Sequence, residues 1–445
     1  MFKQFSNYIF NLKYKNNMFA LYNKTIEKSE KKNHDKGNIL IAPVSGAPVQ
    51  SLFDGLYARK ALLNGNSVYT LFCNQFVDLC EILNYGTKLK NLRCNFCKNF
   101  QQLFINVFET IPCYYNDILN RKDIVKINYY IEQYMNRIKE KNFFLGININ
   151  EILYSTLQRH YMVADPEIKN DKTTKLFLFT IFSTILCIDK LCKKIKPKYV
   201  MITHGTYSLW GPILEYCKVN NIRIITYGRS YNKYGLNFAF DETYLKKHQN
   251  DKLNNWKNRE LTLEQKKLVE KAINIRIGKS KGEIAFNYNA ENKKFFSKDE
   301  ICHMLKINKS RKIVALLPNI PWDGQFNGNS LVYPLFRDWL KDTVEFFKNR
   351  DDSVLLIRSH PAEVLKRYNV GDETTQSMIN EIFDILPDNV MVLPHDFILN
   401  SYALGLVSDF ILVYSSTVGL ELTYLKKPVL AVGNPPYINK GIVYD

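Results

Sequence analysis

The sequence predicts an α/β protein with two doubly wound parallel sheets, and three observations support this fold class. Short β-rich runs alternate with helix-compatible stretches in the first half of the chain. The same alternation returns after residue 310. The stretch between the two halves, about 241–309, is polar, rich in Lys and Glu, and has no convincing strand. The 445 residues, 46% of them hydrophobic, are enough to bury two substantial cores.

The first domain is expected over residues 38–240, after an N-terminal extension of residues 1–37. A strand over Asn38–Val44 ends at Pro and Gly, and an apolar pattern of helical spacing, an Asn-Gly turn and a second strand, "SVYTLFC", follow it. A second βαβ unit begins with the strand Tyr199–Thr203, continues through a helix and ends with a strand near 223–227. Such units predict a parallel sheet.

The second domain is expected over residues 310–445, after a helical connector at 241–309 that contains "LTLEQKKLVEKAINIRIG". It opens with the strand "RKIVALLPN", and the amphipathic helix "FRDWLKDTVEFFKNR" follows. Four more β-rich runs, each followed by polar or turn residues, complete the sheet: "SVLLIR", "NVMVL", "FILVYSS" and "KPVLAVG". No repeat of fixed period is visible, so two Rossmann-like domains in tandem are the simplest account.

Composition narrows the classes of function. The formal net charge is +18, but the lysines are scattered and no helix-turn-helix, zinc-finger or aromatic RNA-binding signature accompanies them, so nucleic-acid binding is not expected. Scattered basic charge does suit a peripheral contact with the inner face of the cytoplasmic membrane. The chain shows no signal-peptide pattern and no run of 18 apolar residues, and it has nine cysteines; it is expected to be cytoplasmic, with reduced thiols.

Ligands of open parallel sheets bind beyond the carboxyl ends of the strands, and four strand ends of the second domain carry polar residues. Three hydroxyls precede a helix expected near Val418, where backbone N–H groups and the helix dipole favour a phosphate, and Glu421 is expected to accept hydrogen bonds from ribose hydroxyls. Helix capping by the hydroxyls, a solvated Glu421 and a structural His360 are the alternatives. The candidate donor-site residues are Asn319, Asp323, Arg358, His360, Glu363, Ser415, Ser416, Thr417 and Glu421.

The stretches "LLIRSHPAE", "LVYSSTVGLELTYLKKPVLAVG" and "YINKGIVYD" resemble those of bacterial capsule polysaccharide biosynthesis proteins, which are glycosyltransferases of the GT-B architecture. They also resemble nucleotide-sugar transferases that hold a cytidine nucleotide with a His-Pro and a Ser-Ser/Thr motif. The similarity includes "LLPNIPWDG" and "THGTYSLWGPILEYCKVNNIRIITYGR" and extends from about residue 38 to the end. Such domains usually continue beyond this Lys-Gly segment, so the chain is expected to be a fragment or a shortened form.

The resemblance implies two Rossmann-like domains that face each other across a cleft. It implies that His360, Ser415, Ser416 and Thr417 contact the donor nucleotide and its phosphate. The implied reaction moves a sugar from a nucleotide-sugar donor to a glycan or glycolipid acceptor. A sugar-nucleotide epimerase of the same architecture and a non-catalytic binding subunit of polysaccharide assembly are the alternatives. The sugar, the acceptor and the linkage are not defined by the sequence.

Transfer requires a base for the acceptor hydroxyl, and the first domain is expected to supply it. His204 is the leading candidate because it follows a strand end and precedes Gly205, and Asp54 is the second. A hydrogen-bonded loop histidine is the alternative. No cofactor is expected to be required for catalysis. Cys73, Cys80, Cys94 and Cys97, with the short "CNFC" spacing, are candidates for a structural zinc site, and buried free cysteines are the alternative.

Overall fold

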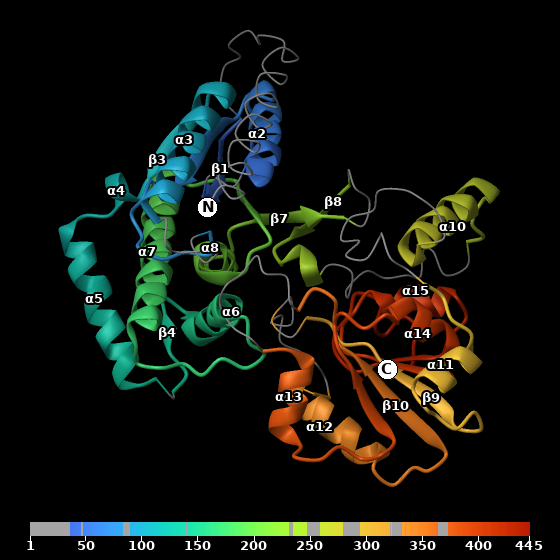
Figure 1. Ribbon diagram of the computed structural model, residues 1–445. Helices are drawn as coiled ribbons and strands as arrows, with labels where there is room; N and C mark the ends of the chain where they lie inside the picture. Colours follow the sequence, from blue (N-terminus) through green and yellow to red (C-terminus); the bar gives the residue numbers. More distant parts are fainter. Residues whose placement is uncertain are drawn as a thin grey trace. The chain divides into compact units, whose positions relative to one another are not determined.

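The computed structural model describes residues 36–45, 48–82, 90–138, 140–230, 235–246, 259–278, 294–320, 322, 332–333, 335–363 and 373–445. The chain divides into two compact units, each with its own parallel sheet (Figure 1). Unit 1 comprises Met1–Thr156, Ile168–Tyr227 and Ala239–Thr243, and unit 2 comprises Leu157–Glu167, Gly228–Phe238 and Tyr244–Asp445. The predicted α/β class with two Rossmann-like sheets is confirmed. The predicted cleft between the domains stays a prediction.

The sheet of the first half has six strands in the order β3-β2-β1-β6-β7-β8, of which β1, β2, β3, β6 and β7 pair in parallel. Its strands are β1 (Asn38–Val44), β2 (Ser67–Phe72), β3 (Ile111–Tyr114), β6 (Tyr199–Thr203), β7 (Ile224–Arg229) and β8 (Leu236–Phe240). A separate hairpin pairs β4 (Phe143–Phe144) with β5 (Ile147–Asn148). The central strand β1 is almost wholly buried, as expected for a sheet covered by helices on both faces.

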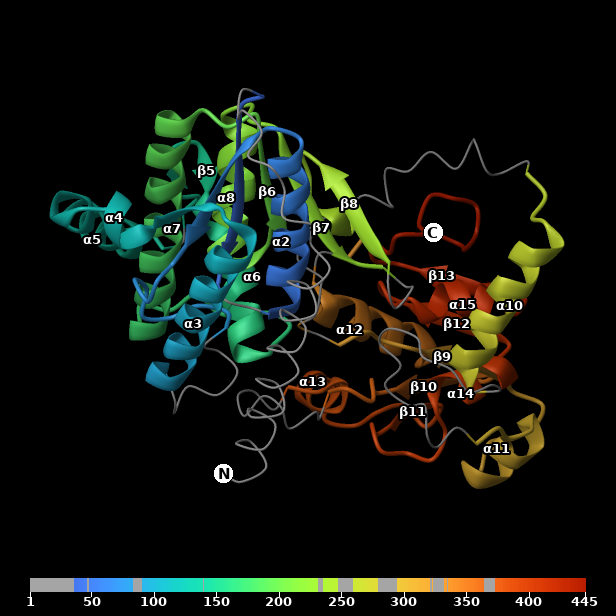
Figure 2. The same ribbon diagram turned by 90° about the horizontal axis from the view of Figure 1, so that it is seen from above.

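Helices cover both faces of this sheet. The helices of this half are α2 (Pro48–Leu63), α3 (Lys90–Phe108), α4 (Tyr115–Ile118), α5 (Arg121–Asn136), α6 (Ile149–Tyr161), α7 (Lys172–Ile195) and α8 (Tyr207–Val219). Figure 2 shows α2 on one side of the strands and α7 with α8 on the other. Helix α7 is buried along most of its length because α5 packs against its outer side. No helix of the described residues is long and apolar enough to cross a membrane.

The sheet of unit 2 has five parallel strands in the order β11-β10-β9-β12-β13. Its strands are β9 (Lys312–Leu316), β10 (Ser353–Arg358), β11 (Val390–Leu393), β12 (Phe410–Val413) and β13 (Val429–Ala431). The helices of this half are α10 (Leu263–Ile277), α11 (Lys298–Met304), α12 (Phe336–Phe347), α13 (Thr375–Ile382), α14 (Ser401–Val407) and α15 (Val418–Tyr424).

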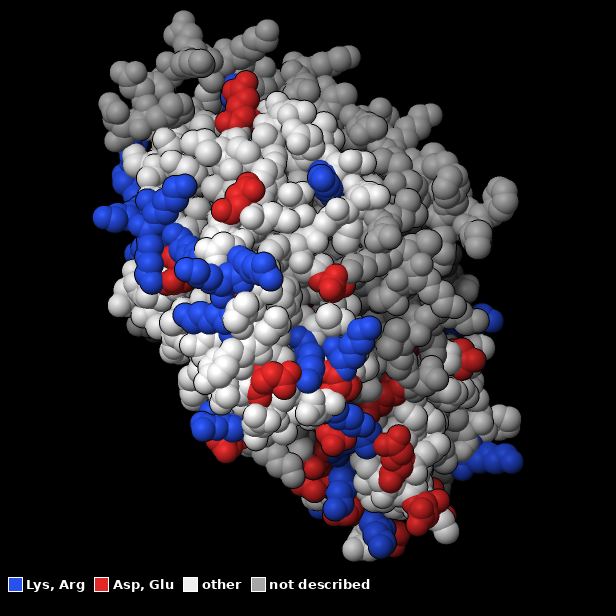
Figure 3. Space-filling model, turned by 90° about the vertical axis from the view of Figure 1, so that its left-hand side faces the viewer, with Lys and Arg blue, Asp and Glu red and all other residues white. Residues whose placement is uncertain are grey.

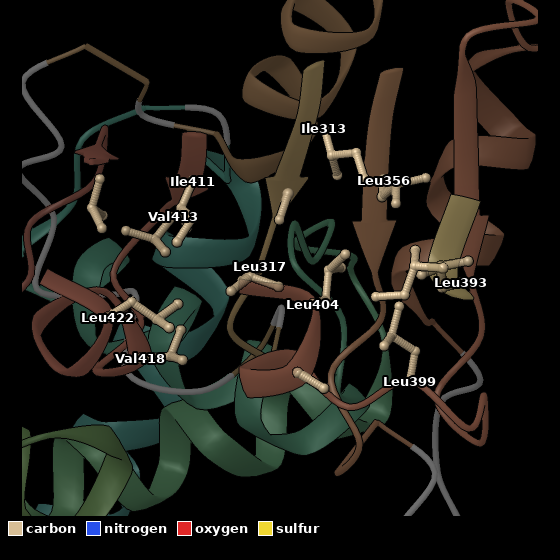
Figure 4. Packing of buried hydrophobic residues seen from close by; sticks show 14 of the residues in the cluster. Ile313, Leu317, Leu356, Leu393, Leu399, Leu404, Ile411, Val413, Val418 and Leu422 are labelled. Atoms are coloured by element: carbon tan, nitrogen blue, oxygen red, sulfur yellow. The ribbon is translucent and has the colours of Figure 1, made fainter. Parts of the chain in front are cut away.

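Alternate residues of β9 point to opposite faces of the sheet, and each face has its own core. Ile313 and Ala315 belong to a cluster with residues of α11, α14 and α15, part of which Figure 4 shows. Val314 and Leu316 belong to a second cluster with α12 and α13, which contribute Trp339 and other large side chains. These two cores fix the sheet between its helices, so the carboxyl ends of the strands form one ordered edge.

The predicted strands agree closely with the structure; those over Asn38–Val44 and Tyr199–Thr203 have the predicted bounds. The stretch expected to be a connector behaves differently, because residues from Tyr244 onward belong to unit 2 and α10 packs there. Residues 157–167, which come from the middle of the first half, also belong to unit 2. Backbone N–H of Ala164 donates a hydrogen bond to the Glu373 carboxylate, and that carboxylate also binds Arg337 on α12.

Candidate functional site

The strand order of unit 2 places a topological switch point between β9 and β12. Strands β10 and β11 lie on one side of β9, and β12 and β13 lie on the other. Connections therefore leave β9 and β12 in opposite directions and open a crevice at their carboxyl ends. Asn319 follows β9 and Ser415 follows β12, and the Asn319 Oδ1 accepts a hydrogen bond from the Ser415 backbone N–H at 3.4 Å. The structure thus brings these two predicted site residues together at the switch point.

The hydroxyls of Ser415, Ser416 and Thr417 do not cap the helix that follows them. Thr417 is the N-cap residue of α15, yet its side chain makes no capping hydrogen bond. Within the described residues, the three hydroxyls take part in no hydrogen bond with the protein, and Thr417 is exposed while the two serines are half-buried. The capping alternative is therefore wrong. The hydroxyls are accessible to a polar ligand at this edge.

The backbone beneath these hydroxyls is held in one conformation. The carbonyl oxygen of Ser416 accepts hydrogen bonds from the Tyr437 hydroxyl and from the Gly419 backbone N–H, the latter at 3.2 Å. A Cβ at position 419 would lie 2.3 Å from the Tyr437 hydroxyl oxygen, so only glycine permits this approach. The segment from Ser415 to Thr417 is called the hydroxyl loop below.

His360 follows β10, beside β9, and is neutral at physiological pH. Burial, and then the charge of Arg358, lower the pKa of His360 from 6.5 to about 4. Its Nδ1 accepts a hydrogen bond from the Ala362 backbone N–H at 3.1 Å, so the proton of the neutral ring is on Nε2. A hydrogen bond from His360 to a phosphate would therefore come from a neutral ring and not from an imidazolium. The neutral ring carries a single N–H, on Nε2.

Arg358 was a candidate donor-site residue, but the structure gives it a structural role. Its guanidinium donates five hydrogen bonds to backbone carbonyls, which belong to Ser359, Pro394, His395, Phe397 and Leu399. These are all the donors that a guanidinium has. Burial lowers the pKa of Arg358 to about 10, which still leaves it charged at neutral pH. Arg358 therefore anchors the loop after β11 and has no N–H left for a phosphate.

The two predicted carboxylates of this edge are also engaged within the protein. Glu363 accepts hydrogen bonds from the His360 N–H at 3.0 Å and from the Thr375 N–H and hydroxyl at 3.0 and 2.6 Å, which connect the β10 loop to α13. Glu421 faces Arg276 of α10, with 3.2 Å between Oε1 and Nε, and its Oε2 accepts a 2.6 Å hydrogen bond from the Tyr402 hydroxyl. The expectation that Glu421 binds ribose is corrected, because it is neither a ribose-facing nor a solvated residue.

The remaining donor-site candidate, Asp323, lies outside the described residues. Its neighbour Trp322 is buried, and the Arg159 guanidinium carbon lies 4.7 Å from the centre of the Trp322 ring. Arg159 belongs to the segment of the first half that joins unit 2. This cation–π contact was not foreseen, because residues 157–167 show no sequence signal for packing on a distant domain.

Unit 1 has a switch point of its own, between β1 and β6, and His204 lies there. His204 follows β6 as predicted, and Gly205 with φ +73° turns the chain toward α8. The His204 Nδ1 accepts a hydrogen bond from the Thr206 N–H at 3.2 Å and lies 2.7 Å from the Thr206 hydroxyl oxygen. A neutral ring in this arrangement carries its proton on Nε2. The base role of His204 stays a prediction, and it requires the ring to give up the Thr206 contact.

Two buried carboxyls lie near the same edge of this sheet. Asp54 on α2 accepts a 2.8 Å hydrogen bond from the Tyr227 hydroxyl, and Glu81 accepts one of 2.8 Å from the Leu209 N–H in the first turn of α8. Burial raises the pKa of each to about 7, and their hydrogen bonds offset this only in part. Asp54 was a predicted site residue, whereas Glu81 was missed; the only signal was the presence of two acids within the otherwise apolar run "FVDLCEIL".

The four candidate zinc ligands, Cys73, Cys80, Cys94 and Cys97, line one small cavity of about 30 Å³. Cys94 and Cys97 lie one turn apart on α3, whereas Cys80 lies in an irregular stretch after β2. Among the described residues, no three His, Cys, Asp or Glu side chains stand close enough together to hold a metal ion. The side chains as placed do not form the tetrahedral site, and structural zinc stays a prediction.

Comparison with known proteins gives distant similarities of backbone. No protein-family model matches the chain, and no curated protein matches it by sequence. KpsC from Thermosulfurimonas dismutans, a β-Kdo 2,4-transferase, is 15% identical over 56% of this chain and 73% of its own, with a TM-score of 0.39. The β-Kdo 2,7-transferase of the same name and organism is 13% identical over 58% of this chain and 72% of its own, with a TM-score of 0.34. A UDP-GlcNAc 2-epimerase from Neisseria meningitidis is 11% identical over 88% of this chain and 81% of its own, with a TM-score of 0.21.

Proposed function

We propose that this protein is a glycosyltransferase that moves a sugar from a nucleotide-sugar donor, with a cytidine nucleotide favoured, to a growing capsular or surface polysaccharide. The observation that supports this most is the hydroxyl loop, whose three side chains make no hydrogen bond to the described part of the chain and lie beside Asn319 at the switch point of unit 2. Hydroxyls and backbone N–H groups at such a point suit the oxygens of a nucleotide phosphate. The preference for cytidine rests on the resemblance of the His-Pro and Ser-Ser/Thr motifs to those of transferases that hold a cytidine nucleotide.

The chemistry at the donor edge follows from the protonation states of its residues. With Arg358 engaged by backbone carbonyls, phosphate recognition depends on neutral donors, the hydroxyls of the hydroxyl loop. The acceptor hydroxyl needs a base, for which a pKa close to the working pH is best. Asp54, with a pKa of about 7, meets this electrostatic condition, while the Nδ1 of His204 is engaged by Thr206. We propose Asp54 as the first base to test.

An epimerase is less well supported by this geometry. Proton transfer at a sugar ring needs carboxylates beside the nucleotide. The two glutamates of the donor edge are instead held by Thr375, Arg276 and Tyr402. Incubation with a labelled cytidine nucleotide sugar and a glycan acceptor separates the possibilities. Labelled glycan is the expected product; a changed sugar on the same nucleotide would indicate an epimerase, and tight binding without any product would indicate a binding subunit.

The nucleotide site can be tested at the hydroxyl loop. The double variant Ser416→Ala/Thr417→Val should weaken binding of a cytidine nucleotide by about ten- to a hundredfold, because hydrogen bonds to a charged group contribute about 1.5–3 kcal/mol. Isothermal titration would measure the affinity, and a thermal-shift screen of cytidine, uridine, guanosine and adenosine nucleotides would identify the base.

Thr423→Val is the matched control for this variant. Thr423 lies on α15, the helix that follows the hydroxyl loop. Its hydroxyl donates a hydrogen bond to the Gly419 carbonyl at 2.9 Å, so its loss should leave nucleotide affinity unchanged. Circular dichroism would verify that both variants fold. An unchanged affinity in the folded double variant would refute the phosphate site.

A further inference from the structure

The outer face of unit 1 exposes large apolar side chains that lie close together. We use the name outer face for the exposed surface of α5, the β4–β5 hairpin, and the C-terminal parts of α7 and α8. Val125 and Tyr129 of α5 are 65% and 60% exposed, and Phe143 of the hairpin is 62% exposed. Leu145 in the hairpin turn is 44% exposed, and Val219 at the end of α8 is 46% exposed. Five such side chains on one face are unusual for a surface that meets only water.

Contacts beneath the surface show that these side chains belong to one patch. Tyr130, the neighbour of Tyr129, packs edge-on against Phe144, the neighbour of Phe143, with 4.5 Å between ring centres. Phe144 also packs against Phe182 of α7 at 5.1 Å, which fixes the hairpin beside that helix. At the hairpin turn, the Cβ position of Gly146 lies 3.0 Å from Val219. The hairpin therefore lies between α5 and the end of α8.

Basic side chains accompany the apolar ones on the same face. The ion pair between the Lys190 Nζ and the Asp123 Oδ2, at 2.5 Å, holds the start of α5 against the end of α7. Eight exposed basic residues of these segments form no ion pair with a carboxylate within the described residues: Arg121, Lys122, Lys126, Arg137, Lys141, Lys194, Lys196 and Lys198. The acids nearby are largely engaged, since Asp189 pairs with Lys193 and Glu132 with Lys175.

The surface view agrees with this arrangement. Figure 3 looks onto the side that carries α4 and α5 in Figure 1, and Lys and Arg gather in its upper half among white side chains, with few acids between them. Lys198 lies just before β6, at the amino end of that strand. The basic end of the outer face is therefore on the opposite edge of the sheet from His204. A partner bound there leaves the carboxyl edge open.

We propose that the outer face docks on an anionic membrane surface. Unpaired lysines attract acidic headgroups, and exposed aromatic and aliphatic side chains can enter the boundary between headgroups and acyl chains. A nucleic acid would engage the lysines but would leave Val125, Phe143 and Leu145 in water, so the lipid surface fits both halves of the patch. The inference uses no residue of the donor site and stands whether or not the protein is a transferase.

Co-sedimentation of the full chain with vesicles tests the contribution of the basic side chains to membrane docking. The protein should bind vesicles that contain phosphatidylglycerol, bind vesicles of phosphatidylcholine alone much more weakly, and leave the anionic vesicles as salt is raised. Lys194→Gln/Lys196→Gln should weaken binding by about thirtyfold. The control Lys267→Gln/Lys348→Gln removes the same charge from exposed positions of unit 2 and should bind as the parent protein does.

A second variant tests the contribution of the exposed apolar side chains to membrane docking. Tyr129→Ser/Phe143→Ser keeps every charge, and it should weaken vesicle binding by about tenfold or more at a salt concentration that screens the lysines. Equal binding to neutral and anionic vesicles, or no binding to either, would overturn the proposal. So would binding to a DNA or RNA duplex that depends on the lysines and not on Tyr129 and Phe143. Concentration-dependent self-association that the Tyr129/Phe143 variant abolishes would instead assign the face to a second copy of the chain.

Discussion

Replacement of Arg276 by alanine should lower the free energy of unfolding of unit 2 by about 3–5 kcal/mol, because it leaves a buried carboxylate without its partner charge. The side chains of Arg276 and Glu421 are only 8% and 7% exposed, and their ion pair joins α10 to α15. The Tyr402 hydroxyl satisfies the other carboxylate oxygen and cannot compensate the charge. Urea unfolding followed by circular dichroism would measure the loss.

Two further variants make this prediction specific. Lys267→Ala, on an exposed face of the same helix, should change the stability by no more than about 0.5 kcal/mol. Arg276→Met/Glu421→Gln removes both charges, and it should recover more than half of the loss because no buried charge remains unpaired. If Arg276→Ala and Lys267→Ala were equally stable, the ion pair would not hold α10 in place. The result bears on function too, since α15 directly follows the hydroxyl loop.

Asp54→Asn should make the protein more stable at alkaline pH than the parent chain, by up to about 4 kcal/mol, while the difference should be small below pH 4. Burial raises the pKa of Asp54 from 3.8 to about 7 in the folded protein. Between these values the folded chain retains a proton that the unfolded chain has released. The contribution of Asp54 to the stability of the parent protein therefore falls as the pH rises from about 4 to 7, and this contribution is constant above that range.

The asparagine variant lacks this ionisation, and its amide oxygen can still accept the hydrogen bond from Tyr227. Unfolding free energies of both proteins, measured across the pH range, should therefore diverge on the alkaline side. Asp117→Asn alters an exposed carboxyl of the same unit and should leave the pH dependence unchanged. Parallel curves for Asp54→Asn and the parent protein would show that Asp54 is ionised in the folded state near neutrality. The proposed base role would then lose its electrostatic support.

Most of the secondary structure near the site was predictable from sequence because it depends on local patterns. Short β-rich runs bounded by Pro, Gly or polar residues identified β9, β10, β11, β12 and β13. The hydroxyl loop and His360 were found because polar residues directly after buried strands must lie at one edge of a parallel sheet. The helices α5, α6 and α7 and the β4–β5 hairpin were not foreseen, although α5, α7 and the hairpin carry much of the outer face.

By itself, the sequence determined the α/β class, the strands of the second sheet and four strands of the first, and the set of polar side chains at the carboxyl ends of the second sheet. Only the tertiary structure decided which of those side chains are accessible to a ligand. The N–H groups of the Arg358 guanidinium all bond backbone carbonyls of residues 359–399. The Glu421 carboxylate bonds Arg276 and Tyr402. Apart from Ser359, these partners are distant in sequence, and a buried charge is stable only where the fold brings such partners to it. A local pattern defines the chemistry of a side chain, whereas its partners depend on contacts between segments that the pattern does not encode.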